Sequence, residues 1–225
     1  MDANRCVVLL SGGLDSATVA AFAKSKGYTL FALTFVYGQR HEIEVMFASK
    51  LASYFKVHSH EIIHLPDALF KSSALVRSSQ KDIPLNHSGD IPATYVPARN
   101  IVFLSMALAY AETVNVSHIF IGVNAIDYSG YPDCRPEFIE AFQNMIHLGT
   151  KTGIEGKPIV IETPLINLTK SQIIQLGMSL GVDYSLTSSC YNPSPDGKPC
   201  GVCDSCKIRR KGFEEAGIID PALDR

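Results

Sequence analysis

The chain has 225 residues, of which 46% are hydrophobic and 19% are charged, and its formal net charge is −2. This length favours one large folded domain with an appended module over two equal domains. The balanced charge provides no overall basic field for nucleic acid or an anionic membrane, and no apolar run approaches the roughly 18 residues of a membrane span. We therefore expect a cytoplasmic protein.

Strand and helix patterns alternate along most of the chain. In chain order the expected elements are strand Cys6–Leu10, helix Ser16–Lys26, strand Thr29–Val36, helix His41–Phe55, strand Val57–Leu65, helix Arg99–Thr113, strand His118–Val123, helix Pro136–Leu148, a strand from Ile159 and a helix over about Lys170–Leu180. This alternation predicts a mostly parallel sheet with helices on both faces. Residues 66–95 show no clear periodicity and are expected to be a long loop of the kind that forms lids, binding loops or disordered segments.

The stretch SGGLDS (Ser11–Ser16) lies where the first strand meets the first helix. Ligands bind at the carboxyl ends of strands in such sheets, and two consecutive glycines let backbone amides approach an anion at a helix N-terminus. The sequence contains neither G-x-x-x-x-G-K-[ST] nor G-x-G-x-x-G at this junction. The stretch therefore predicts a phosphate-binding loop of another type, and an ordinary turn with a Ser or Asp helix cap is the alternative.

Four of the six cysteines form the pattern C-x9-C-x2-C-x2-C near the C-terminus: Cys190, Cys200, Cys203 and Cys206. Four thiolates complete a tetrahedral Zn²⁺ site and leave no position for water, so the metal is expected to be structural. A redox Cys-x-x-Cys pair is the main alternative. A zinc knuckle beside the basic residues at 207–211 also contacts nucleic acid in some proteins, although charge runs are more often solvated surfaces.

SGGLDS closely resembles the pyrophosphate-binding loop of the N-type ATP pyrophosphatases, which have a Rossmann-like, adenine nucleotide alpha hydrolase-like fold with a parallel five-stranded sheet. The resemblance implies that the chain binds ATP with Mg²⁺ and activates a substrate by adenylation. It implies an ATP site made of Leu10, Ser11, Gly12, Gly13, Leu14, Asp15, Ser16, Ala17 and Thr18.

Further blocks narrow the resemblance to the 7-cyano-7-deazaguanine synthases, over nearly the full chain and in the family's order. They are YGQRHEIE (37–44), TYVPARN (94–100), GVNAIDYSGYPDCRPEF (122–138), ETPLINLTK (162–170) and the four-cysteine segment. Ala98 departs from the glycine of many relatives. The resemblance implies an ATP-dependent C–N ligase that converts 7-carboxy-7-deazaguanine and ammonia to 7-cyano-7-deazaguanine, through an adenylated acid and an adenylated amide, in queuosine biosynthesis. It also implies a homodimer that has no stable association with nucleic acid.

Within these blocks, residues that follow strands or begin helices are the expected site groups. The expected catalytic residues are Asp15, Arg40, Arg99 and Lys170. The expected substrate-binding residues are Gln39, His41, Asn100, Asp127, Tyr128, Tyr131, Asp133 and Arg135, because a planar deazaguanine needs a stacking wall and hydrogen-bond acceptors. Cys134 is expected to be structural. The expected division is an α/β domain over residues 1–185 and a zinc-binding segment over residues 186–225.

Two alternatives stay open at this stage. One is another adenylating ATP pyrophosphatase, either a tRNA thiolation enzyme or an amide-forming synthetase. The sequence has no cysteine in the usual place of a persulfide carrier and no room for a glutaminase domain. The other is a noncatalytic zinc-containing nucleotide or RNA binder, which predicts ATP binding without turnover.

Overall fold

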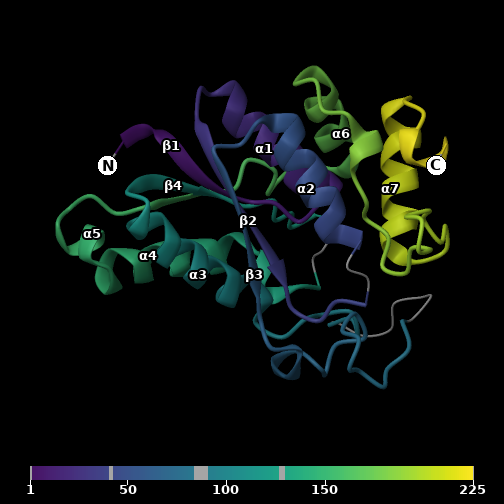
Figure 1. Cartoon of the computed structure of the whole chain (residues 1–225), viewed down its shortest axis with the longest axis horizontal. Coiled ribbons are helices and arrows are strands. Elements are labelled where there is room, and N and C mark those ends of the chain that lie inside the picture. The colour runs from purple at the N-terminus through teal and green to yellow at the C-terminus, as the bar shows by residue number, and fades with distance from the viewer. Residues whose placement is uncertain (1, 41–42, 84–90, 127–129, 225) are drawn as a thin grey trace.

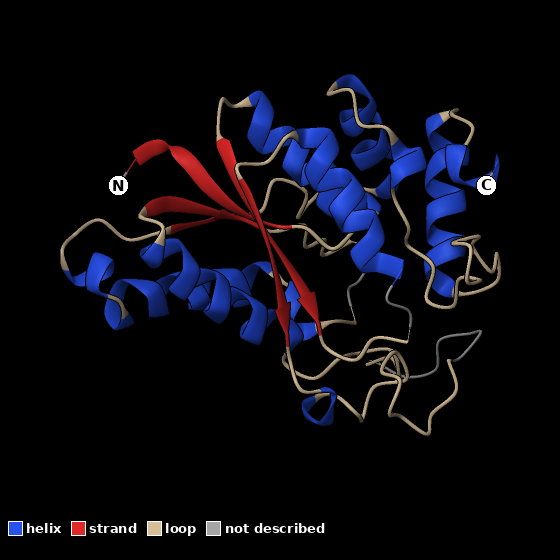
Figure 2. Ribbon diagram, viewed as in Figure 1, coloured by secondary structure: helices blue, strands red, loops and turns tan. Residues whose placement is uncertain are grey.

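The apolar runs predicted as strands pair in one sheet (Figures 1 and 2). The computed structural model describes residues 2–40, 43–83, 91–126 and 130–224. The strands are β1 (Asp2–Leu9), β2 (Thr29–Val36), β3 (Ser59–His64), β4 (Val116–Phe120) and β5 (Val160–Glu162). They are parallel and lie in the order β3-β2-β1-β4-β5, which confirms the five-stranded parallel sheet.

The helices cover both faces of the sheet (Figure 1). They are α1 (Leu14–Ser25), α2 (Ile43–Phe55), α3 (Arg99–Thr113), α4 (Pro136–Gly149), α5 (Lys151–Ile154), α6 (Lys170–Ser179) and α7 (Asp204–Ala216). Alternation along β1 explains the two layers, since successive side chains of a strand point to opposite faces. Val7 and Leu9 pack in a core with α3 and α4, whereas Cys6 and Val8 pack in a second core with α1, α2, α6 and α7. A sheet buried on both faces needs such continuous apolar strands.

Several element boundaries differ from those predicted. β1 begins at Asp2, because its first residue pairs with Val116 of β4, which itself begins and ends earlier than predicted. α1 begins at Leu14, because Gly13 rather than a Ser or Asp is its N-cap. The short α5 was not predicted; Thr150 caps it by accepting a hydrogen bond from the Gly153 amide.

At β1 the direction in which successive parallel strands are added to the sheet reverses. β1 pairs with β2 on one side and with β4 on the other, so the crossover connections run outward in opposite directions from this point. In open α/β sheets such a switch point leaves a crevice at the carboxyl ends of the strands, where ligands bind. The predicted phosphate loop follows β1 and therefore opens into this crevice.

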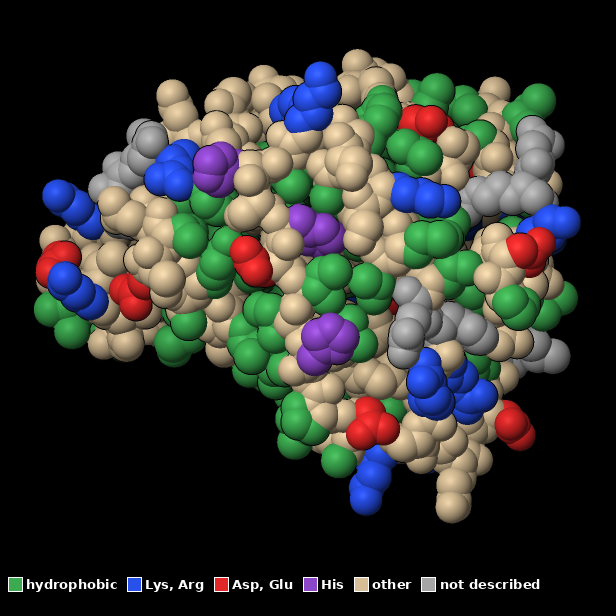
Figure 3. Space-filling model, viewed as in Figure 1, with side chains coloured by type: hydrophobic (Ala, Val, Ile, Leu, Met, Phe, Trp, Pro, Cys, Tyr) green, Lys and Arg blue, Asp and Glu red, His purple; other side chains and the backbone are tan. Residues whose placement is uncertain are grey.

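The face seen in Figure 3 carries its Lys and Arg side chains in separate groups, with apolar and uncharged surface between them. None of the helices in the described part of the chain combines the length and the apolar character needed to cross a membrane.

Candidate active site

A cavity of about 250 Å³ lies at the carboxyl ends of β1, β2 and β4. Its wall contains residues that follow these strands, among them Ser11 after β1, Tyr37 after β2 and Gly122 after β4. The first turns of α2 and α3 add the charged side chains of Glu44 and Arg99. The cavity therefore occupies the crevice that the strand order predicts.

The SGGLDS loop is held in one shape by its own hydroxyl groups. The Ser16 hydroxyl donates to the Gly13 carbonyl at 3.0 Å and accepts from the Ser11 amide at 3.2 Å. Gly12 has a φ of +85°, and the Gly12 carbonyl accepts from the Ser188 amide at 2.9 Å. Since the N-cap residue Gly13 gives no side-chain cap to α1, the first amides of α1 remain suited to an anionic ligand.

The structure separates the predicted ATP residues into three groups. Leu10, Ser11, Asp15 and Ser16 line the cavity. Gly12 and Gly13 form the turn behind them. Leu14, Ala17 and Thr18 are buried residues of α1, and the Thr18 hydroxyl lies 2.9 Å from the Leu14 carbonyl and 2.8 Å from the Tyr184 hydroxyl. The last group therefore positions α1 rather than facing a nucleotide.

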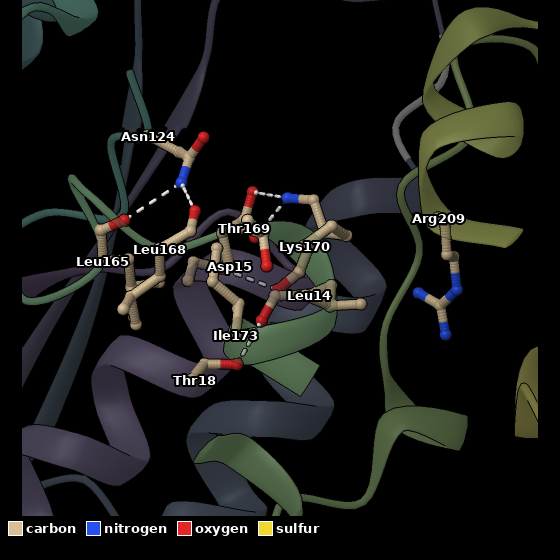
Figure 4. A network of polar contacts seen from close by, with 12 residues as sticks. Leu14, Asp15, Thr18, Asn124, Leu165, Leu168, Thr169, Lys170, Ile173 and Arg209 are labelled. Atoms are coloured by element: carbon tan, nitrogen blue, oxygen red, sulfur yellow. Dashed lines mark hydrogen bonds and ion pairs between the residues drawn. The ribbon is translucent and has the colours of Figure 1, made fainter. Parts of the chain in front are cut away.

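Lys170 is directed at Asp15 (Figure 4). Its ammonium group donates to both carboxylate oxygens, at 2.7 and 2.9 Å. The Lys170 side chain is 7% exposed and that of Asp15 is 20% exposed, so the pair is mostly desolvated on the lysine side while the carboxylate reaches the cavity. Thr169, whose side chain accepts from the Gln172 amide, caps α6 and fixes the helix start that carries Lys170. Lys170 thus orients Asp15, and Asp15 is the member of the pair that faces the cavity.

Arg99, Tyr37 and Glu44 form an electrostatic group in the cavity wall. Burial alone lowers the pKa of Arg99, but Tyr37, Cys134 and Asp133 outweigh it, and the guanidinium stays charged. Burial raises the pKa of Tyr37, and the charge of Glu44 raises it further against the opposing effect of Arg99. A fixed cation next to a neutral phenol is suited to binding a carboxylate or phosphate.

Gln39 and Arg40 fix the chain that leaves β2. The buried Gln39 side chain accepts from the Tyr37 amide at 2.8 Å and donates to the Phe35 carbonyl at 3.3 Å. The Arg40 guanidinium donates to the carbonyls of Ala74, at 2.8 Å, and Lys81. Both residues line the cavity, and Arg40 ties the long loop that begins at residue 66 to the cavity edge.

The remaining predicted substrate residues lie in two settings. Asn100 and Tyr131 line the cavity. Asp133 is buried behind it and accepts from the Asn100 amide at 2.9 Å, while Arg135 is exposed and is not part of the described cavity wall. The Tyr131 hydroxyl is 2.7 Å from that of Thr94. His41, Asp127 and Tyr128 lie outside the described residues.

The four predicted metal ligands come together. The sulfur atoms of Cys190, Cys200, Cys203 and Cys206 all lie within 4.8 Å of one another. Backbone amides of Asn192 and Cys200 donate to the Cys190 sulfur at 3.3 and 3.2 Å, as is suited to a thiolate. The donor set and its spacing fit a four-coordinate Zn²⁺ site, and none of these cysteines is in a disulfide.

The cysteine cluster adjoins the cavity. Cys190 and the neighbouring Tyr191 contribute to the cavity wall. The following chain is fastened to the main fold by Arg209, which donates to both Asp220 carboxylate oxygens at 2.7 and 2.8 Å and to the Thr187 hydroxyl at 2.8 Å. The cysteine cluster is therefore part of the wall beside the phosphate loop.

The cavity-wall residues that sequence reasoning missed include Tyr37, Glu44, Asn124 and Tyr191. Tyr37 and Glu44 are the two ends of the block YGQRHEIE, so their place in that block was an available signal. Asn124, in the block that begins at Gly122, donates to the carbonyls of Leu165 and Leu168 at 3.0 and 2.5 Å (Figure 4). It ties the end of β4 to the chain that leads into α6.

Lys170→Met is expected to lower the free energy of unfolding by about 2 kcal/mol, because it leaves the partly buried Asp15 carboxylate without its cation. Urea titration measures this change. Lys211→Met is the matched control, since Lys211 is exposed on α7 and forms only a surface pair with Glu215 at 3.7 Å. Equal stabilities for the two variants would contradict a structural role for the Lys170–Asp15 pair.

Comparison with known proteins finds related sequences over nearly the whole chain. Residues 5–217 match the sequence model of the family described as Queuosine biosynthesis protein QueC. The chain is 56% identical over 223 residues to the 7-cyano-7-deazaguanine synthase of Desulfatibacillum aliphaticivorans, covering 96% of this chain and 95% of that protein. It is 56% identical over 220 residues to the 7-cyano-7-deazaguanine synthase of Magnetococcus marinus, again covering 96% and 95%.

Among solved structures, a 4-thiouridine synthetase in complex with RNA and with bound ATP superposes with a TM-score of 0.56 at 18% identity, covering 95% of this chain and 50% of that chain. This likeness concerns the fold alone and agrees with the Rossmann-like architecture expected from the phosphate loop. The family match and the two relatives extend over nearly the whole chain. The chain belongs to the queuosine biosynthesis protein QueC family.

Proposed function

We propose that the chain catalyses the ATP-dependent conversion of 7-carboxy-7-deazaguanine and ammonia to 7-cyano-7-deazaguanine. One observation carries the proposal beyond the names of the relatives. Ser11, Asp15 and Ser16 of the SGGLDS loop line the same cavity as Arg40 and Arg99, so that phosphates and a substrate carboxylate would meet positive charge in one place. Positioned charge of this kind is often the largest contribution to catalysis of acyl and phosphoryl chemistry.

The proposed reaction uses two activations. A carboxylate oxygen of the substrate attacks the α-phosphate of ATP and pyrophosphate leaves. Ammonia then attacks the carbonyl carbon, the bond to the AMP oxygen breaks, and an amide results. The amide oxygen attacks the α-phosphate of a second ATP and pyrophosphate leaves again. The nitrogen then loses its two protons, and AMP departs with that oxygen as the carbon–nitrogen triple bond forms. One loop serves both activations, because each requires the same bond between an oxygen and the α-phosphate.

The roles follow from the placement of the side chains. Ser11, Ser16 and the first amides of α1 would bind the pyrophosphate portion of ATP. Asp15 presents a carboxylate at this loop, and carboxylate with phosphate oxygens is the donor set that Mg²⁺ prefers, so Asp15 would hold the Mg²⁺ that neutralises phosphate charge. Tyr131 and Asn100 would contact the deazaguanine.

Other parts of the proposal concern assembly. The four cysteines would hold a structural Zn²⁺, and residues 186–225 would form a zinc-binding segment on an α/β domain of residues 1–185. The homodimer and the substrate contacts of His41, Asp127 and Tyr128 stay predictions from the family resemblance.

The direct test is a reaction with the purified protein, Mg-ATP, ammonium and 7-carboxy-7-deazaguanine, analysed by mass spectrometry together with the nucleotide products. The expected result is the nitrile, with AMP and pyrophosphate. Nitrile with ADP would keep the overall function and overturn the adenylation scheme. ATP binding without conversion, by folded protein that contains zinc, would favour a noncatalytic binder or another adenylated substrate.

A further inference from the structure

Glu44 is fixed beside the phosphate loop by the packing of α2. A Cβ atom on Gly12 would lie 2.5 Å from the Glu44 carbonyl oxygen and 2.9 Å from the Ala48 amide, so the first turn of α2 and the loop are in close backbone contact. The Glu44 side chain lines the cavity. The helix start therefore sets a carboxyl group next to the site proposed for ATP.

Two acidic side chains, Asp15 and Glu44, are present in the described cavity wall, and their surroundings differ. Both oxygens of Asp15 accept hydrogen bonds from Lys170. The charge that acts on Glu44 is Arg99, and among the described residues none donates a hydrogen bond to the Glu44 carboxyl group. Among the described residues, Glu44 therefore faces the cavity without the hydrogen-bonded cation that fixes Asp15.

The pKa of Glu44 lies closer to neutral pH than those of Cys134 and Tyr37 in the cavity wall. Burial raises the pKa of Glu44 to about 7, against the effect of Arg99, which lowers it. Burial also raises the pKa of the Cys134 thiol to about 11 and raises that of Tyr37, so both stay protonated near neutral pH. The remaining charged or titratable groups that face the described cavity are Asp15, Arg40, Arg99, Tyr131, Cys190 and Tyr191. A base works best when it exchanges its proton near the working pH.

We propose that Glu44 accepts the protons that the attacking nitrogen must lose, a role that rests on the proposed function. When ammonia adds to the acyl adenylate, the nitrogen forms a bond to the carbonyl carbon, carries a positive charge and becomes an amide nitrogen only after it loses one proton. When the adenylated amide collapses to the nitrile, the nitrogen loses its remaining protons and AMP leaves with the oxygen. Glu44 takes each proton onto its carboxylate and returns it to solvent between steps.

Glu44→Gln keeps the shape and hydrogen-bonding reach of the side chain but removes the base. We expect kcat of the ammonia-dependent step to fall by about 100-fold or more, with little change in KM for 7-carboxy-7-deazaguanine. Exchange of labelled pyrophosphate into ATP, which needs the deazaguanine acid but no ammonia, should continue, because adenylation of a carboxylate releases no proton. At a fixed concentration of free ammonia, the wild-type rate should rise with pH up to about 7, and the variant should lack this rise.

The outcomes separate the two proposals. Glu140→Gln, an exposed site on α4, is the matched control and should behave as wild type. Amide and nitrile formation by Glu44→Gln at the wild-type rate would overturn the role of Glu44. A large rise in KM for the deazaguanine acid with kcat unchanged would overturn it too, and would make Glu44 a substrate-binding group. Absence of pyrophosphate exchange in the wild type would instead contradict the adenylation scheme, and absence of both amide and nitrile from the wild type would contradict the proposed function.

The burial of the Glu44 carboxyl group can also be tested without an activity assay, by measuring how the melting temperature depends on pH. The folded-state pKa lies above the ordinary value of 4.5, so the contribution of Glu44 to stability is present at low pH and is lost as the pH rises through about 7. Glu44→Gln should therefore melt about 4 °C higher than wild type at about pH 8, and close to wild type at about pH 5. An equal or lower Tm of the variant at the higher pH would show that the folded protein does not desolvate this carboxyl group.

Discussion

Gly12→Ala is expected to abolish ATP binding and to lower the free energy of unfolding by about 4 kcal/mol, by summing left-handed strain and overpacking. Gly12 has a φ of +85°, a conformation that L side chains rarely adopt. The added methyl group would also lie 2.5 Å from the Glu44 carbonyl oxygen and 2.9 Å from the Ala48 amide, and backbone atoms of a helix do not yield as a side chain would. Relief of this overlap requires the loop to move away from α2, which displaces the amides proposed to bind phosphate.

Gly27→Ala is the matched control for that substitution. Gly27 also has a φ of +85°, but its added methyl group would meet nothing within 4 Å. It should therefore cost only the strain of the left-handed backbone, about 1 kcal/mol, and should leave ATP affinity as in wild type. Calorimetric titration with Mg-ATP and urea unfolding measure the two quantities. If Gly12→Ala and Gly27→Ala lost the same stability and both bound ATP, the close packing of the phosphate loop against α2 would not be required for ATP binding.

The sheet could be predicted from the sequence because its central strands β1 and β2 are apolar and largely buried on both faces. Runs such as Cys6–Leu10 and Thr29–Val36 have no other plausible environment, and the helices between them fix the parallel direction. Strand limits were less predictable, because pairing with a neighbour decides them. Asp2 has no strand signal of its own and is added to β1 by its partner Val116.

The site residues likewise fall into those that the sequence predicts and those that only the structure shows. The phosphate loop and the cysteine ligands each lie within a short segment, and the residue types and their spacing in such a segment indicate the ligand. Contacts between distant segments have no such signal. Asp15 and Lys170 are separated by 155 residues, and only the packing of α6 against α1 shows that the lysine bonds the aspartate. The contact between Asp133 and Asn100 is a second example. The Asn100 amide at the start of α3 donates to the Asp133 carboxylate, which is 33 residues away in the sequence.

Loss of the metal is the second large effect that we expect. Cys200→Ser removes one of four ligands, and structural zinc sites contribute on the order of 10 kcal/mol of binding free energy, which also stabilises the fold around them. Zinc content should fall well below one ion per chain, and the residues around the cluster should become sensitive to proteolysis. ATP affinity should fall as well, because Cys190 lies in the cavity wall and the Ser188 amide bonds the Gly12 carbonyl at 2.9 Å.

Cys200→His is the matched control, because an imidazole nitrogen is an equally good zinc ligand and the partly exposed side chain of Cys200 leaves room for the ring. This variant should keep zinc, protease resistance and ATP binding, measured by metal analysis, limited proteolysis and calorimetric titration. Wild-type protein that contains no zinc, yet turns over and loses activity on oxidation, would favour a redox pair of Cys203 and Cys206 instead. Zinc loss from Cys200→Ser with unchanged ATP affinity would show that ATP binding does not depend on the metal. The hydrogen bond between the Ser188 amide and the Gly12 carbonyl would then be sufficient to hold the phosphate loop.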